Sequence, residues 1–137
     1  MENLTVHRVL IASIIAAAIL VYVPFLWVAY GRVRVGWQAL ATPRAMVDKL
    51  PDYAQRATWA HQNAFESFVL FTAAALMAYV TDVEGRWVVG AAIAHLLARS
   101  LYPVFYIANI PVGRSLMFAI GSLGTAILMG ASFKQLF

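Results

Sequence analysis

Apolar residues fall into four long stretches, which are separated by shorter polar segments. The stretches cover about residues 9–30, 57–80, 87–107 and 114–133. Each has the roughly 20 residues that a helix needs to cross the hydrocarbon core of a bilayer. The pattern therefore predicts an all-α, multi-pass integral membrane protein: an up-down four-helix bundle with a polar loop at about 31–56.

The composition agrees with a membrane protein and limits the chemistry. Of the 137 residues, 63% are hydrophobic and 12% are charged, far from the balance of a soluble domain. The length suits a single membrane domain over residues 1–137. The chain has no cysteine, which excludes disulfides, thiolate metal sites and a cysteine nucleophile. Any thiol chemistry must therefore use a thiol from another molecule.

The basic residues predict an orientation in the membrane. The net charge is +4, but the lysines and arginines are scattered, which argues against nucleic-acid binding. Five of them lie in the loop at 31–56: Arg32, Arg34, Arg44, Lys49 and Arg56. Loops rich in Lys and Arg usually stay in the cytoplasm. We therefore expect this loop and the turn near Pro111 to be cytoplasmic, and both termini to be non-cytoplasmic.

The second apolar stretch carries polar residues that are costly inside a bilayer. Trp59, Gln62, Asn63 and Glu66 fall within an arc of about 100° on a helix, while His61 points elsewhere. An ionisable group at mid-membrane costs roughly 2.5–3.5 kcal/mol or more. This stripe is therefore expected to face protein or a water-filled cavity.

The third stretch has a matching stripe formed by His95, Arg99, Tyr102 and Tyr106 at helical spacing. In an up-down bundle, the two stripes, Arg34 and the pair Arg114-Ser115 all come to one membrane face. Together these side chains can form a receptor for a zwitterionic ligand with carboxylates, because arginine binds carboxylates in bidentate geometry.

Structural roles explain several of these residues equally well. Glu66 and Arg99 can be a buried ion pair without catalytic use, and in either case we expect them within salt-bridge distance. Arg34 and Arg114 can be helix-end cations, and Tyr102 and Tyr106 can belong to an interfacial aromatic belt. The histidines, His61 and His95, fit packing roles better than metal ligation, and we expect no metal site.

Several segments resemble one family, the membrane-associated proteins in eicosanoid and glutathione metabolism (MAPEG), which includes the microsomal glutathione transferases. Residues 59–66, Trp-Ala-His-Gln-Asn-Ala-Phe-Glu, are similar to the family's Arg-Ala-His-x-Asn-x-x-Glu signature. The likeness continues in residues 31–34, 98–109 and 114–115, in the same order. It covers nearly the whole chain.

The resemblance implies a homotrimer that binds glutathione between subunits near the cytoplasmic face. The bound thiolate would react with lipophilic electrophiles or lipid hydroperoxides. The residues that match the family's glutathione contacts are Arg34, Asn63, Glu66, Tyr106 and Arg114. Arg114 would stabilise the thiolate, and Ser115 would lie beside the thiol.

This chain departs from the family pattern in three places. Trp59 replaces the arginine of the signature, Gln62 replaces a second arginine found in several members, and Phe118 replaces a tyrosine near the thiol. Two alternatives follow. One is a non-catalytic membrane subunit or interaction protein, possible within a larger membrane complex; the other is a small transporter or proton relay built on Glu66 and His95.

Overall fold

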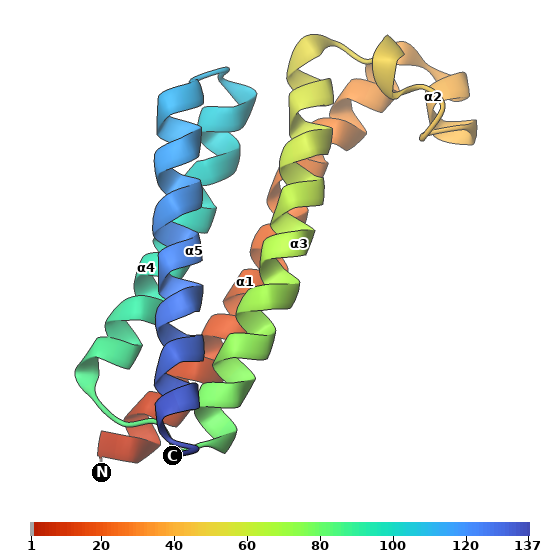
Figure 1. Cartoon of the computed structure of the whole chain (residues 1–137). Coiled ribbons are helices and arrows are strands. Elements are labelled where there is room, and N and C mark those ends of the chain that lie inside the picture. Colours follow the sequence, from red (N-terminus) through yellow and green to blue (C-terminus); the bar gives the residue numbers. More distant parts are fainter. Residues whose placement is uncertain (1) are drawn as a thin grey trace.

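The computed structural model describes the backbone of residues 2–137 and the side chains from Thr5 onward. Its elements are α1 (Glu2–Val35), α2 (Trp37–Ala41), the 3-10 turn η1 (Val47–Lys49), α3 (Asp52–Val80), α4 (Arg86–Ile107) and α5 (Pro111–Lys134). The helices α1, α3, α4 and α5 are long and apolar enough to cross a membrane. They run up and down as a bundle (Figure 1), which confirms the predicted fold class.

Figure 1 defines two ends of the bundle. Both termini and the α3–α4 turn lie at one end, here called the terminal end, and α2 with the α4–α5 turn lies at the other, here called the loop end. The helices extend beyond the predicted apolar stretches. α1 continues to Val35, and α3 begins at Asp52, directly after Pro51. Much of the segment predicted as a loop is therefore helical.

The terminal half of the bundle has a core of small residues. Ala74, Ala75, Ala78 and Ala92 are fully buried there, together with Phe71. Small side chains let helices approach closely, which is how membrane helices gain packing energy without a hydrophobic driving force. Gly124 shows how close α4 and α5 are, because a Cβ at that position would lie 2.7 Å from the carbonyl oxygen of Ala91.

Pro24 interrupts the hydrogen bonding of α1, and a side chain of α3 bonds to α1 close to it. A proline lacks the N–H of the helix ladder and disturbs the carbonyls one turn earlier. His61 Nδ1 lies 2.8 Å from the carbonyl oxygen of Val21, in the position of a donor. The ring also packs 5.2 Å from the ring of Phe25. His61 thus joins α3 to the part of α1 that precedes Pro24 and takes no part in the polar stripe, as its sequence position predicts.

Candidate functional site

Five of the predicted site residues form one continuous series of contacts at the loop end. They are Asn63 from α3, Arg99, Tyr102 and Tyr106 from α4, and Arg114 from α5. The guanidinium of Arg99 lies 4.4 Å from the ring centre of Tyr102, and the rings of Tyr102 and Tyr106 meet edge to face at 5.5 Å. Arg114 closes the series, 4.7 Å from the ring centre of Tyr106. We call these five residues the polar cluster.

Arg99 is the buried centre of the polar cluster, with 7% of its surface exposed. Its Nη2 donates a 3.0 Å hydrogen bond to Asn63 Oδ1. Its stem packs against α5, where a Cβ at Gly121 would come within 3.2 Å of Arg99 Cδ. The expected ion pair between Glu66 and Arg99 is wrong: neither residue occurs in a salt bridge among the described residues. A neutral amide, one turn from Glu66, takes that position.

Glu66 and Gln62 instead lie on the outer surface of the single chain, where both are exposed. Asn63 and Glu66 line a groove of about 370 Å³ between α3 and α5, which continues over Phe118, Ser122 and Thr125. Its lining combines Asn63 and Glu66 with the apolar side chains of Leu70, Phe118 and Met129. The groove therefore offers a carboxylate and an amide beside a surface that suits a lipophilic molecule.

The first turn of α5 fixes the position of Arg114. α4 ends at Ile107, and Asn109 adopts a left-handed conformation with φ 58° that reverses the chain. Helix α5 then begins at Pro111, so Arg114 lies in its first turn, where the helix dipole adds positive potential.

Arg56, which in the sequence stood out only as one of the cations of the loop, supports this turn. Arg56 lies in the second turn of α3, and its Nε donates a 2.9 Å hydrogen bond to the carbonyl oxygen of Ile107. That carbonyl belongs to the last residue of α4, where helix carbonyls have no partner within the helix. The charge alone gave no signal of this role, because the partner is a backbone group far away in the sequence.

Arg34 and Ser115 are not part of the polar cluster in the single chain. Arg34 is exposed at the end of α1, and its Nη1 donates a 3.1 Å hydrogen bond to the hydroxyl of Tyr30. Ser115 is exposed next to Arg114. The structure thus gathers five predicted residues and leaves Arg34, Gln62, Glu66 and Ser115 facing outward.

His95 is buried below the polar cluster and belongs to the packing of the bundle. Its Nδ1 lies 2.9 Å from the carbonyl oxygen of Gly121, and its ring stacks on Phe71 with centroids 3.8 Å apart. Thr125 Oγ1 lies 3.2 Å from the same nitrogen. Both histidines that drew attention in the sequence therefore bond to backbone carbonyls of neighbouring helices.

Comparison with known proteins gave one match. The model of the MAPEG family matches residues 9–134 of the chain, a range that includes most of α1, all of α3, α4 and α5, and every candidate site residue. Searches of curated proteins and of solved structures each returned no match.

Proposed function

Because this chain belongs to the MAPEG family of membrane proteins, we propose that it binds glutathione and presents its thiolate to lipophilic electrophiles or lipid hydroperoxides. The chain has no cysteine, so the thiol must come from a small molecule. Glutathione has two carboxylates and one ammonium group. The outward-facing site residues offer complementary charges: Arg34 is a cation for a carboxylate, and Glu66 is a carboxylate for the ammonium group.

The exposed carboxylate of Glu66 is the observation that carries this proposal. Glu66 lies nine residues beyond the start of the apolar stretch at about 57, a rise of roughly 14 Å, which places Glu66 well inside a spanning helix. A charge that faced lipid at this depth would be costly. Glu66 therefore needs a partner from outside the chain, and the ammonium group of glutathione is a fitting one.

The same argument supports assembly into a homotrimer, with the ligand between neighbouring subunits. The outward stripe of α3 and the groove between α3 and α5 remain open in one chain. Covering them with a second copy would remove Gln62 and Glu66 from lipid. It would also allow Arg34, which has no place in the polar cluster of its own chain, to meet a ligand held by another.

Within this site we assign different tasks to the two arginines of the polar cluster. Arg114 is half-buried in the first turn of α5, so its charge is available to favour a thiolate over a thiol. Arg99 is already engaged by Asn63 and Tyr102, and therefore positions these residues rather than binding the ligand.

The proposed reaction is a nucleophilic substitution or addition. In a substitution, the sulfur supplies the electron pair of the new carbon–sulfur bond, and the leaving group departs with the pair of the bond that breaks. In an addition, the pair of the electrophile's π bond moves to the neighbouring atom, which takes a proton from water. With a hydroperoxide, the thiolate attacks the terminal oxygen and the O–O bond breaks, so that the alkoxide takes a proton and leaves as an alcohol and the sulfur becomes a sulfenic acid. The thiol of a second glutathione attacks that sulfur and yields the disulfide and water. The apolar residues that line the groove, Leu70, Phe118 and Met129, suit substrates that arrive through the bilayer.

A non-catalytic membrane subunit is the second candidate, and Trp59 favours it. This tryptophan stands where the family signature has arginine and is 46% exposed on the outward face of α3. It places an apolar ring where a carboxylate of glutathione would need a cation.

Calorimetric titration of the detergent-purified protein with glutathione separates the two candidates. We expect saturable binding that is weakened in Glu66→Gln and Arg114→Gln. Arg86→Gln is the matched control, because Arg86 is exposed at the terminal end. Binding that is absent from the folded wild-type protein would contradict the glutathione proposal and favour the non-catalytic subunit.

A further inference from the structure

The segment between α1 and α3 contains an exposed apolar surface that the proposed thiol site does not use. α1 ends at Val35, and Gly36 turns the chain with φ 112°, a conformation that favours glycine. The short helix α2 follows directly. Figure 1 shows it beside the bundle at the loop end, at the level where the first turns of α3 begin.

One face of α2 fixes this helix to the bundle. Ala39 is fully buried in an apolar cluster with Val28, Leu50, Ala54 and Ala57. These residues come from α1, from the loop and from α3. The helix is therefore held at a defined place and does not belong to a loose loop.

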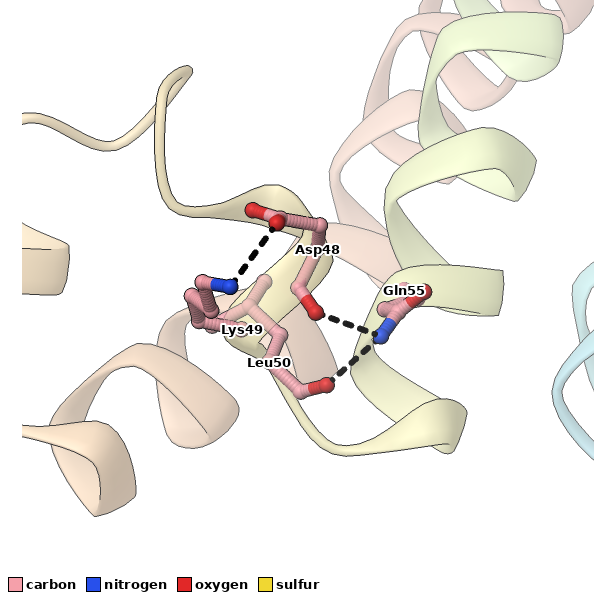
Figure 2. A network of polar contacts seen from close by, with 4 residues as sticks. All are labelled: Asp48, Lys49, Leu50 and Gln55. Carbon is pink, nitrogen blue, oxygen red and sulfur yellow. Dashed lines mark hydrogen bonds and ion pairs between the residues drawn. The ribbon is translucent and has the colours of Figure 1, made fainter.

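The last part of the segment, residues 48–50, is held to α3 by hydrogen bonds, as Figure 2 shows. Gln55 Nε2 donates hydrogen bonds to the carbonyl oxygens of Leu50, at 2.8 Å, and Asp48, at 3.3 Å. Lys49 Nζ lies 3.3 Å from Asp48 Oδ2. The chain after η1 is thus anchored to the start of α3. Leu50, which belongs to the same apolar cluster as Ala39 of α2, is held in place with it.

The opposite face of α2 is apolar and exposed. At 100° per residue, Trp37, Leu40 and Ala41 share one side of the helix, roughly opposite Ala39. Trp37 is 79% exposed and Leu40 is 47% exposed. Such an arrangement, with an apolar face turned away from the protein, is typical of a helix that lies in a membrane interface.

The charge of the surrounding segment and its position next to the long helices indicate what covers the exposed face of α2. Between residues 31 and 50 the chain has Arg32, Arg34, Arg44 and Lys49, and Asp48 is its only acidic residue. Helices that are long and apolar enough to span a membrane flank the segment on both sides, so we expect it near the level where hydrocarbon gives way to headgroups. Tryptophan is enriched at that depth, and cations there attract anionic lipids.

We infer that α2 is an interfacial anchor: Trp37 and Leu40 insert among the lipid headgroups of the membrane that the bundle crosses, and the surrounding cations favour anionic lipids. This inference concerns a lipid contact and is independent of glutathione binding. It predicts that the loop end is held at a fixed depth in the bilayer.

Spin labels can test the inference without a background, because the chain has no native cysteine. We would label Leu40→Cys and, as the matched control on the polar side of α2, Gln38→Cys, both in phosphatidylcholine vesicles. We expect the label at 40 to collide more often with oxygen than with a water-soluble nickel chelate, and the label at 38 to show the reverse. Equal, water-like values at both positions would overturn the inference.

The native tryptophan provides a second measurement that does not depend on a label. Subtracting the fluorescence of Trp37→Phe from that of the wild-type protein gives the emission of Trp37. Lipids brominated near the headgroup should quench this emission, and aqueous iodide should not. Quenching by iodide alone would place Trp37 in water. Shielding from both quenchers would place it against a second copy of the chain; either result would overturn the inference.

The lipid preference has its own test with phosphatidylglycerol added to the vesicles. The oxygen-to-nickel ratio at position 40 should rise, and Arg44→Gln should reduce that rise, whereas Arg86→Gln at the terminal end should not. A ratio that does not respond to phosphatidylglycerol would overturn the preference for anionic lipids.

Discussion

The terminal half and the loop half of the bundle differ in the side chains that lie between their helices. In the terminal half, buried alanines and Gly124 bring backbones into direct contact. In the loop half, Arg99, Tyr102 and Asn63 occupy the space between helices. A groove between α3 and α5 opens beside Asn63 and Glu66 and continues toward the terminal half as far as Met129. In the terminal half, close packing stabilises the contact between α4 and α5. The loop half uses part of its interhelical space for polar side chains instead.

The largest loss of stability is expected from Asn63→Leu in the loop half. The substitution removes the oxygen that accepts the hydrogen bond of Arg99 and leaves a buried charge without that partner. A hydrogen bond to a charged group contributes roughly 1.5–3 kcal/mol, so the free energy of unfolding should fall by about that amount. Denaturation in detergent, followed by circular dichroism, measures the loss.

Arg99→Met combined with Asn63→Leu provides the control for this prediction. The double variant has no stranded charge and should be more stable than Asn63→Leu alone. If Asn63→Leu unfolds at the same denaturant concentration as the wild-type protein, the polar cluster does not contribute to stability as described.

A comparable loss is expected from Gly124→Ala in the terminal half. The new methyl group would meet the carbonyl oxygen of Ala91, a backbone atom that cannot move aside alone. Overpacking of this kind costs about 1–3 kcal/mol. Gly130→Ala is the matched control, because no atom lies within 4 Å of a Cβ there, and it should be neutral or slightly stabilising. Equal melting temperatures for the two variants would show that α4 and α5 are less closely packed than described.

Arg114→Ala should change chemistry more than stability. If Arg114 favours the thiolate of bound glutathione, its loss lowers the ionised fraction at pH 7, and the conjugation rate should fall by about tenfold, or roughly 1.4 kcal/mol. Thiolate absorbance, titrated with pH in the glutathione complex, gives the ionised fraction directly. A variant that keeps both the rate and the ionised fraction would make Arg114 a helix-end cation only.

The smallest expected effect concerns His61, which joins α3 to α1. His61→Leu removes the hydrogen bond to the carbonyl oxygen of Val21 and should lower stability by about 0.5–1.5 kcal/mol. The melting temperature should change modestly and glutathione binding should not. A clear loss of binding at unchanged stability would show that His61 positions the α3 site residues.

The membrane fold was predictable because hydropathy over a span is a local property of the chain. The stretch at 87–107 matched α4 (Arg86–Ile107) closely. The start of α3 was predicted too late, at about 57 rather than Asp52, because the residues after Pro51 are polar but still helical. The apolar composition of a stretch indicates only the part of a helix that lies in the hydrocarbon core, whereas the helix itself can continue beyond that core.

The candidate site was predictable only in part. The sequence by itself determined four spans, the family signature and which side chains carry charge, since each depends on residue type and spacing. The tertiary structure decided the pairing: Asn63, not Glu66, meets Arg99, although only one helical turn separates these two residues of α3. It also gave Arg56 its backbone partner at Ile107. The physical reason is that a small rotation of a helix about its axis selects which of two neighbouring side chains faces inward, and only contacts between helices fix that rotation.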